Sequence, residues 1–317
     1  MKGWLFFVMI IAAVTLHGEE ALQAIVDDAW QGINGFHFSG RLTEVHPAPA
    51  KDSGRLEALY RNTRMLLASG EEGTVTWRVA DNEWSVRADD HGYWELAANQ
   101  PLTLKPGWYD IKTEPVASSR AGFIVPDPRN GVGIISDIDD TILVSDVLSK
   151  SSLLTNSLTV PAEQREPVPG MAALYVQVLK ANAAPEASLV FYVSTSPRQL
   201  TDNLRRFLQV NGFPRGVLQL KEIASENGDS QREHDAYKRR RIEVILGAFP
   251  KLRFHFFGDD AERDPEIYAD VLAKHPAQVA GIWIRRINPD AERPVYSGQN
   301  DVQELMNGAK PAAEKSK

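Results

Sequence analysis

The sequence of 317 residues contains no cysteine. This absence excludes disulfide bridges, thiolate metal sites and a cysteine nucleophile. Basic residues are also fewer than acidic ones: the chain has 35 Lys and Arg and 42 Asp and Glu, which gives a formal net charge of −7. Such a balance offers no positive field to attract nucleic acid, and we expect no nucleic-acid partner.

Long hydrophobic runs are scarce. The apolar run 3–16 at the N-terminus follows one Lys and has 14 residues, whereas a membrane-spanning helix needs roughly 20. Residues 1–18 are therefore predicted to be a signal peptide cleaved after Gly18, which implies an exported, periplasmic or secreted protein. Leu16 is larger than the small residue usual three positions before a cut, so an uncleaved membrane anchor stays the alternative.

The remaining chain divides into two parts of different pattern. Segments of alternating polarity at 74–79, 84–87 and 92–96 are separated by turn signals and predict a small, mainly antiparallel β domain. Residues 56–67 have helical spacing instead. The tryptophans of the alternating segments are interpreted as β-domain core rather than as a lipid-binding patch: Trp77, Trp84 and Trp94. The predicted divisions are a signal peptide at 1–18, a β-rich domain at 19–124, a linker at 125–130, an α/β domain at 131–290, and a C-terminal segment at 291–317 whose end is disordered.

Beyond residue 131, short apolar runs alternate with amphipathic stretches. This alternation predicts an α/β fold with a parallel sheet and helices on both faces. The expected strands are 133–136, 189–193, 217–220, 254–257 and 281–284. The expected helices lie near 170–181, 197–211, 232–248 and 265–274.

Hydroxyls and carboxylates follow three of these expected strands. In open parallel sheets, ligands bind beyond the carboxyl ends of the strands, so these residues are expected to form one site. They are Asp137, Asp139 and Thr141 after the first strand, Ser194 and Thr195 after the second, and Asp259, Asp260 and Asp264 after the fourth.

The acidic residues indicate a metal and a phosphate. Asp137 and Asp139 share a face of an extended chain, roughly 7 Å apart, so one carboxylate is free to attack a substrate while the other transfers a proton. A cation is needed beside so many carboxylates, and hard oxygen ligands without thiolates point to Mg²⁺. Ser194 and Lys238 add donors for a phosphate, which suits an aspartyl-phosphate mechanism.

Four motifs in this order resemble those of the haloacid dehalogenase superfamily of phosphatases, over about half the chain. They are Asp137-x-Asp139-x-Thr141, Ser194 after an apolar strand, Lys238 on a helix, and Gly258-Asp259 with Asp264. More narrowly, five strings are similar to the actin-patch-type phosphatidate phosphatase family: SDIDDTI at 136–142, PGMAALY at 169–175, YVSTSP at 192–197, GDDAERDPEIY at 258–268 and IWIRRI at 282–287. The N-terminal β region is similar to the domain that precedes the catalytic part in that family.

The resemblance implies a Rossmann-like fold and roles for particular residues. Asp137 would be the nucleophile and Asp139 the general acid and base, while Ser194 and Lys238 would bind the phosphoryl group. Thr141 would help hold the loop, and the implied substrate-binding hydroxyls are Thr141 and Thr195. The implied metal ligands are Asp137, Asp139 through its backbone carbonyl, and Asp259, with Asp260 or Asp264 contributing directly or through water.

Several residues have a second interpretation. Ser196 and Asp264 each precede a proline, a pattern typical of helix N-caps, so Ser196 is interpreted as a cap and Asp264 as a cap or a metal ligand. Lys221, at another strand end, is the rival of Lys238. Arg198 takes a position that is aromatic in many relatives, which suggests a changed substrate rim. His91 and His255 are expected to be structural histidines. Arg285 and Arg286 are expected to be surface residues, with contact to a phosphate or a lipid headgroup as the alternative.

The family resemblance implies removal of phosphate from phosphatidate to leave diacylglycerol, with contact to the membrane surface. The segment 142–169 is the one insertion expected over the site, and its modest length leaves room for a lipid. Small soluble phosphomonoesters are the main rival substrates. A non-catalytic module that binds Mg²⁺ or phosphate is the rival of another class. A serine hydrolase is disfavoured because no G-x-S-x-G motif surrounds Ser194.

Overall fold

The computed structural model describes residues 21–45, 69–144, 162–222, 230–288, 290 and 293–308. The predicted signal peptide, the expected helix at 56–67 and most of the expected insertion over the site lie outside these residues. Within them, no helix combines the length and the apolar character needed to cross a membrane.

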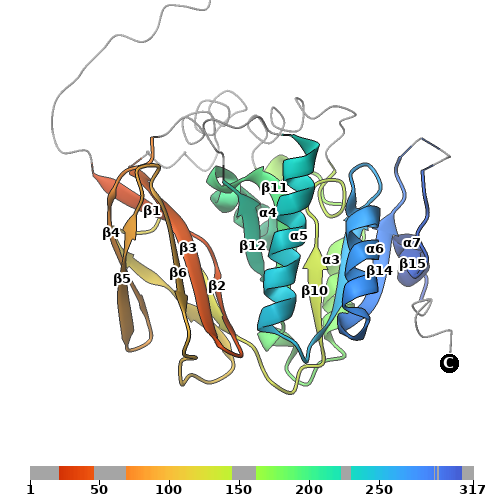
Figure 1. Ribbon diagram of the computed structural model, residues 1–317, viewed down its shortest axis with the longest axis horizontal. Coiled ribbons are helices and arrows are strands. Elements are labelled where there is room, and N and C mark those ends of the chain that lie inside the picture. The colour runs from red at the N-terminus through yellow and green to blue at the C-terminus, as the bar shows by residue number, and fades with distance from the viewer. Residues whose placement is uncertain are drawn as a thin grey trace, which may run out of the picture.

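The C-terminal half is built on a six-stranded parallel sheet (Figure 1). Its strands are β10 (Val132–Ser136), β11 (Val190–Pro197), β12 (Val217–Lys221), β13 (Arg253–Asp259), β14 (Val279–Arg285) and β15 (Gln299–Asp301). The predicted parallel sheet is confirmed, with strand order β12-β11-β10-β13-β14-β15. The chain runs outward from β10 in one direction and from β13 in the other, which makes their junction the topological switch point where ligands of such sheets bind.

Helices cover both faces of this sheet, as the sequence pattern predicted (Figure 1). The helices are α3 (Met171–Leu179), α4 (Thr201–Val210), α5 (Gln231–Ala248), α6 (Asp264–Lys274) and α7 (Val302–Met306), with short 3-10 turns at Ala162–Gln164, Pro185–Ala187, Arg198–Leu200 and Pro276–Gln278. Successive strand residues point to opposite faces, so Ile134 packs with α3, α4 and α7 while Ile135 packs with α5 and α6. Burial on both faces explains the unbroken apolar runs that marked these strands in the sequence.

The N-terminal half contains two further sheets. One has the order β1-β3-β2-β9-β7 with β6 beside β3, and the other has the order β5-β4-β8. Their strands are β1 (Leu22–Val26), β2 (Ala29–Gly32), β3 (Gly35–Glu44), β4 (Gly73–Val79), β5 (Asn82–Ala88), β6 (Tyr93–Ala98), β7 (Gly107–Asp110), β8 (Lys112–Glu114) and β9 (Gly122–Val125). Neighbouring strands are antiparallel except for β2 and β9.

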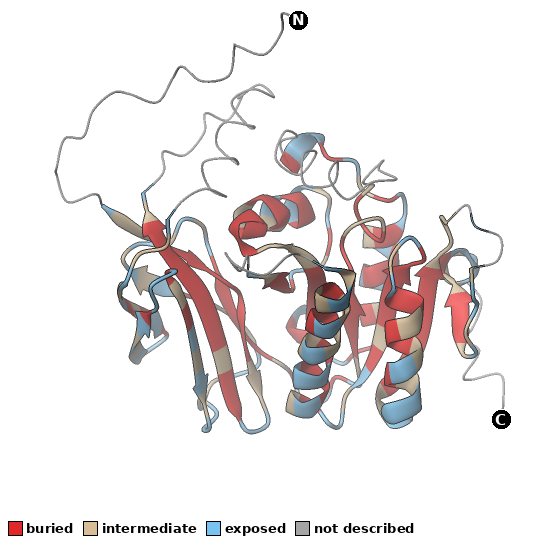
Figure 2. Ribbon diagram, turned by 45° about the horizontal axis from the view of Figure 1, so that its top comes forward, coloured by how far each residue is buried: buried red, intermediate tan, exposed pale blue. Residues whose placement is uncertain are grey.

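Aromatic side chains of both sheets belong to one core cluster of this half, and the buried residues of its strands are red in Figure 2. Trp77 stacks on Phe38 with ring centroids 3.8 Å apart, and Trp84 stacks on Trp77 at 4.4 Å. Trp77 and Trp94 are buried, and Trp84 packs against the same cluster. The prediction that these tryptophans form core is confirmed.

Buried ion pairs join the two halves. Asp27 and Asp28, between β1 and β2, accept contacts from Arg198 at 3.3 Å and from Arg205 of α4 at 3.1 Å. Trp30 of β2 also meets Phe191 of β11 edge-on, with ring centroids 5.5 Å apart. The suggestion that Arg198 belongs to a substrate rim is wrong, because this side chain is only 4% exposed and bridges the two halves.

Replacement of Asp28 by Ala is predicted to lower the free energy of unfolding by about 2 kcal/mol, because half-buried Arg205 loses one of its two carboxylate partners and keeps only Asp202 at 3.3 Å. The backbone N–H of Gly122, which donates to Asp28 at 2.7 Å, also loses its acceptor. The matched control is Asp110→Ala, which breaks an exposed pair with Arg120 and should have little effect. Equal losses in urea denaturation of the two variants would contradict this account.

The free energy of unfolding is also predicted to depend on pH through His255 of β13. Burial lowers the pKa of His255 to about 4, and its Nδ1 accepts a hydrogen bond from Nε1 of buried Trp283 at 3.2 Å. The unfolded side chain binds a proton below about 6.5, so this contribution is complete above that pH and is lost as the pH falls toward 4. His255→Gln should flatten the dependence of unfolding free energy on pH between about 6.5 and 4. An unchanged slope in that window would refute the assignment.

Candidate active site

The loop after β10 places its carboxylates by alternation. Ile138 is buried in the core beneath α3 and α4, so its neighbours Asp137 and Asp139 lie on the other side of the chain. The backbone N–H of Asp137 donates to the Phe257 carbonyl of β13 at 2.9 Å, which fixes the start of the loop at the switch point. Asp140 then takes a left-handed conformation with φ 55° and turns the chain back. This conformation is tolerated better by Asp than by most residues, which accounts for the third acid of the run.

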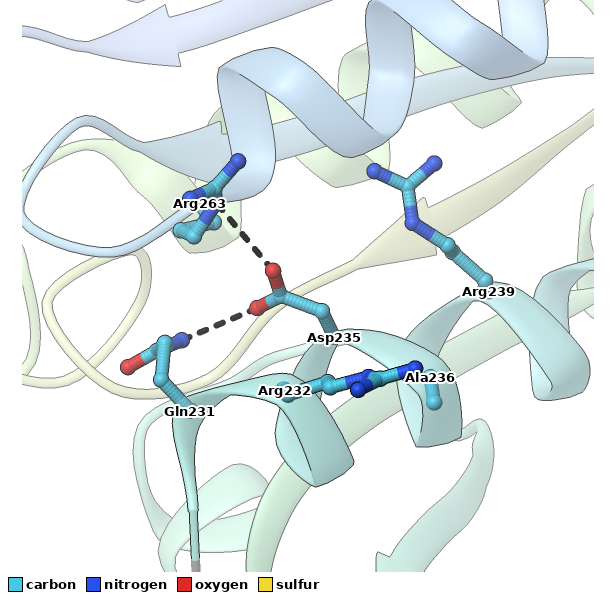
Figure 3. A pocket seen from close by; sticks show the side chains of 6 residues that line it. All are labelled: Gln231, Arg232, Asp235, Ala236, Arg239 and Arg263. Atoms are coloured by element: carbon cyan, nitrogen blue, oxygen red, sulfur yellow. Dashed lines mark hydrogen bonds and ion pairs between the residues drawn. The ribbon is translucent and has the colours of Figure 1, made fainter.

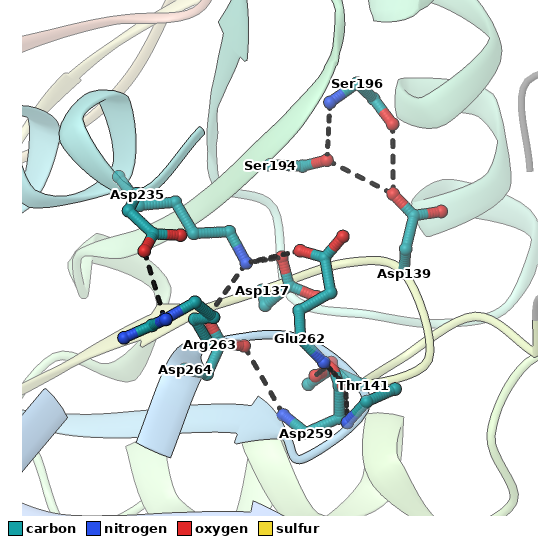
Figure 4. Close-up of polar contacts among 12 residues, drawn as sticks. Asp137, Asp139, Thr141, Ser194, Ser196, Asp235, Asp259, Glu262, Arg263 and Asp264 are labelled. Atoms are coloured by element: carbon teal, nitrogen blue, oxygen red, sulfur yellow. Dashed lines mark hydrogen bonds and ion pairs between the residues drawn. The ribbon is translucent and has the colours of Figure 1, made fainter. Parts of the chain in front are cut away.

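Three carboxylates from two strand ends meet at this place (Figure 4). Asp137, Asp259 and Asp264 each offer an oxygen, and these oxygens all lie within 4.8 Å of one another. All three side chains are buried, with residue exposures of 3%, 0% and 0%. The structure therefore brings together the acids that the sequence had placed after the first and fourth strands.

Lys238 of α5 completes the cluster. Its Nζ lies 2.8 Å from Oδ1 of Asp137, 2.8 Å from Oδ1 of Asp264 and 3.4 Å from Oε2 of Glu262. The side chain is 4% exposed, so it is a buried cation rather than part of a solvated charge run. Its rival Lys221 ends β12, the edge strand of the sheet. Glu262 is a member that the sequence analysis missed, because nothing in its spacing separated it from a surface acid.

The buried carboxyl groups of this cluster raise one another's pKa values, so the site favours the binding of a positive charge. Burial raises the pKa of Asp137 well above its usual range, Lys238 lowers it in part, and Asp264 and Asp259 raise it further. Burial likewise raises the pKa values of Asp259 and Asp264. Burial alone would lower the pKa of Lys238, but Asp137 and Asp264 hold it well above the ordinary lysine value. When all three are ionised, the triad carries two more negative charges than Lys238 compensates, besides the charge of the partly exposed Glu262.

This donor set fits a hard divalent cation. The three carboxylates converge from buried positions, and their excess of two negative charges is what one such ion neutralises. Oxygen ligands without thiolate or imidazole favour Mg²⁺ over softer metals. Asp137, Asp259 and Asp264 are the residues that would hold it.

Asp139 belongs to a second polar group beside the triad. The hydroxyls of Ser194 and Ser196 donate to its Oδ2 at 3.2 and 3.0 Å, and the Ser196 backbone N–H donates to Oγ of Ser194 at 2.9 Å (Figure 4). The interpretation of Ser196 as a helix cap is wrong, since this residue lies within β11 and its hydroxyl is bound to Asp139. Thr195, between the two serines, is half-buried.

Arg165 is a second residue that the sequence analysis missed. It is buried, and burial lowers the pKa of its guanidinium while the nearby Asp139 carboxylate raises it. Its segment is paired with the loop after β10, because Val144 donates to the Glu166 carbonyl and Val168 to the Ile142 carbonyl, both at 2.9 Å. No strand end precedes Arg165 in the sequence, so only the fold identifies it.

The remaining candidates support the cluster. The hydroxyl of Thr141 donates to Oδ2 of Asp259 at 3.2 Å, and Nη1 of Arg285 donates to the Asp140 carbonyl at 2.6 Å, so Arg285 is more than a surface residue. The capping interpretation of Asp264 is wrong, because α6 has Arg263 at its N-cap and the Asp264 carboxylate contacts Lys238 instead. Asp260 lies outside the triad, and its Oδ1 accepts two backbone N–H bonds of 2.7 and 2.8 Å from residues 287 and 288.

Asp259→Asn is predicted to raise the melting temperature of the metal-free protein and to abolish its further rise on addition of Mg²⁺. The amide removes one of three buried like charges and keeps the shape that accepts the N–H groups of residues 261 and 262. Calorimetry should show a loss of Mg²⁺ affinity of at least about tenfold. The matched control is Asp260→Asn, which should retain the Mg²⁺ response, and identical behaviour of the two variants would refute the triad as the metal site.

Comparison with known proteins agrees with this geometry. The family described as "Phosphatidate phosphatase APP1, catalytic domain" matches residues 132–286. Phosphatidate phosphatase APP1 of Saccharomyces cerevisiae is 30% identical over 183 residues, which are 56% of this chain and 30% of that protein. An uncharacterized protein of Schizosaccharomyces pombe is 28% identical over 165 residues, 51% of this chain and 26% of its own length. The chain thus spans less than a third of the length of these two relatives.

Among solved structures, a chain of a Pnkp1/Rnl/Hen1 complex aligns with a TM-score of 0.34 and 15% identity over 52% of this chain and 48% of its own. A likeness at that level supports no conclusion. The family match is of another kind, because it begins at β10, ends just after β14 and encloses the acidic triad, Lys238 and Ser194. Residues 132–286 of the chain thus resemble the catalytic domain of phosphatidate phosphatase APP1.

Proposed function

We propose that residues 131–290 form a Mg²⁺-dependent phosphatase domain of haloacid dehalogenase type that hydrolyses phosphomonoesters through an aspartyl-phosphate. One observation carries the proposal: buried Asp137 lies at the switch point of the sheet, in contact with Lys238 and within the carboxylate triad. The resemblance to the catalytic domain of phosphatidate phosphatase APP1 supports the same reaction class.

In the first step, a carboxylate oxygen of Asp137 attacks phosphorus and the bond from phosphorus to the ester oxygen breaks. Asp139 donates a proton to the leaving alkoxide, so the alcohol departs neutral. The hydroxyls of Ser194 and Ser196 orient the Asp139 carboxyl group. Ser194 and Lys238 are proposed to hold the oxygens of the transferring phosphoryl group, where charge develops.

In the second step, water attacks phosphorus of the aspartyl-phosphate. Asp139 accepts the proton of that water, the bond between phosphorus and the Asp137 oxygen breaks, and inorganic phosphate leaves. Both carboxyl groups thereby return to their starting protonation states. Bound Mg²⁺ would supply the positive charge that lets an anionic phosphate approach three carboxylates.

The proposed substrate is phosphatidate, which would be converted to diacylglycerol at a membrane surface by an exported protein. The support is the phosphatidate phosphatase activity named for the yeast relative, which shares 30% identity with this chain. Small soluble phosphomonoesters are the second candidate, since the triad, Ser194 and Lys238 recognise a phosphoryl group and not an acyl chain. A module that binds phosphate without turning it over is the third, and Asp137 and Asp139 are both present to argue against it.

Asp137→Asn is predicted to reduce phosphate release by about a thousandfold or more, because the amide is not a nucleophile. The assay uses residues 19–317 with and without Mg²⁺ on phosphatidate in mixed micelles, a nucleotide and p-nitrophenyl phosphate. The matched control is Asp110→Asn on the surface, which should leave the rate unchanged.

Each outcome of this assay has a distinct meaning. Mg²⁺-dependent release from phosphatidate that Asp137→Asn abolishes would support both mechanism and substrate. Release from the soluble esters alone would keep the mechanism and refute the lipid. Mg²⁺ binding by calorimetry without release from any ester would favour the non-catalytic module, and full activity of Asp137→Asn would overturn the mechanism.

A further inference from the structure

A pocket of about 450 Å³ lies on the outer side of α5, separate from the acidic triad (Figure 3). It is lined by Gln231, Arg232, Asp235, Ala236, Arg239 and Arg263. Five of these residues come from the first three turns of α5 and one from the turn between β13 and α6. None of them belongs to the proposed catalytic set.

The lining is strongly cationic. Three arginines face a single carboxylate, Asp235, and that carboxylate is already engaged (Figure 3). Its Oδ1 accepts from Nε2 of Gln231 at 2.9 Å, and its Oδ2 contacts Nε of Arg263 at 3.1 Å. Asp235 pairs with Arg263 and Asp270 of α6 pairs with Arg239, so Arg232 is the positive charge of the lining that no described carboxylate pairs with.

The arginines of the pocket also have guanidinium N–H groups that are not engaged with described residues. The contact of Arg263 with Asp235 uses Nε, and within the part of the chain that the structure describes its two Nη atoms form no ion pair or hydrogen bond. Arg232 makes no ion pair with any described residue. Arg239 uses Nη1 for Asp270 of α6 and is one-third exposed. Paired N–H groups of guanidinium match the oxygens of a phosphate better than a lysine ammonium does.

Two ion pairs connect α5 to the turn after β13; α5 supplies the acid in one of them and the base in the other. Asp235 and Lys238 lie three residues apart on one face of α5, and they contact the consecutive residues Arg263 and Asp264. Lys238 contacts Asp137 and Asp264 of the acidic triad, whereas Asp235 and Arg263 line the pocket (Figure 3). The pocket thus shares α5 and the turn after β13 with the candidate active site.

We propose that this pocket, formed by Arg232, Arg239 and Arg263, is a second anion site that binds a phosphate group. The group comes either from an anionic lipid headgroup at a membrane surface or from free phosphate. The inference does not depend on hydrolysis at Asp137, since the binding can be measured without turnover.

The test uses the full chain in EDTA and two probes. One is inorganic phosphate in calorimetry, and the other is sedimentation with phosphatidylcholine vesicles that contain or lack phosphatidylglycerol. Arg232→Gln with Arg239→Gln should weaken binding of one probe by at least about fivefold for each arginine. The matched control is Arg240→Gln, an exposed arginine of the same helix outside the pocket, which should change binding less than twofold, in line with the small worth of an exposed charge.

The pattern of loss identifies the source of the phosphate. Loss confined to anionic vesicles supports a headgroup, and loss with inorganic phosphate supports a soluble anion. Equal effects of the pocket variant and Arg240→Gln, or no binding of either probe by the wild-type chain, would overturn the proposal. Arg232→Gln alone, which breaks no ion pair among the described residues, guards against an effect of misfolding and should still show about half of the loss on a logarithmic scale.

Discussion

The contact of Lys238 with Asp137 and Asp264 is the interaction on which the rest of the site depends. Buried like charges destabilise a fold unless cations compensate them, and one lysine among three carboxylates compensates only in part. The deficit makes the cluster receptive to a divalent cation. Lys238, on α5, contacts Asp264 after β13 and Asp137 after β10, so this one side chain links the three segments.

The N-terminal β half bears on the site through Arg198. This residue follows Ser194 and Ser196 by a few positions, and it is tied to Asp27 on one side and to Glu222 at 2.9 Å on the other. The end of β11, which orients Asp139, is therefore anchored in the β half rather than left as an independent loop. A buried guanidinium between two carboxylates is costly to separate, so the two halves are coupled energetically as well as by sequence.

Much of the fold could be predicted from the sequence because buried strands have a recognisable apolar composition. Strands covered on both faces produce unbroken apolar runs, and five strands of the parallel sheet and four of its helices were predicted close to their observed bounds. Strand β15 and helix α7 were missed, because they lie in the stretch that was interpreted as a C-terminal segment. The convergence of Asp137, Asp259 and Asp264 also followed, since the carboxyl ends of parallel strands meet at one edge. The metal and the catalytic roles remain predictions from that arrangement.

The predictions that were wrong concern side chains whose role depends on tertiary contacts. Ser-Pro and Asp-Pro are good capping signals, yet Ser196 turns to Asp139 and Asp264 to Lys238, because a buried charged partner outweighs a cap. Arg165 and Glu262 gave no signal, and Arg198 was assigned to the wrong place, since the partners of these residues lie far away in the sequence. The arginine pocket was likewise not predicted, because Arg263 follows β13 and meets Arg232 and Arg239 of α5 only in the fold.

The most direct test of the account is to trap the proposed covalent intermediate. The protein would be mixed with Mg²⁺ and a phosphomonoester, reduced with borohydride during turnover, digested, and analysed by mass spectrometry. An acyl phosphate is reduced to an alcohol, so the account predicts homoserine at position 137 and no change at Asp139, Asp259 or Asp264. Phosphate release without modification of Asp137, or reduction at another carboxylate, would contradict it.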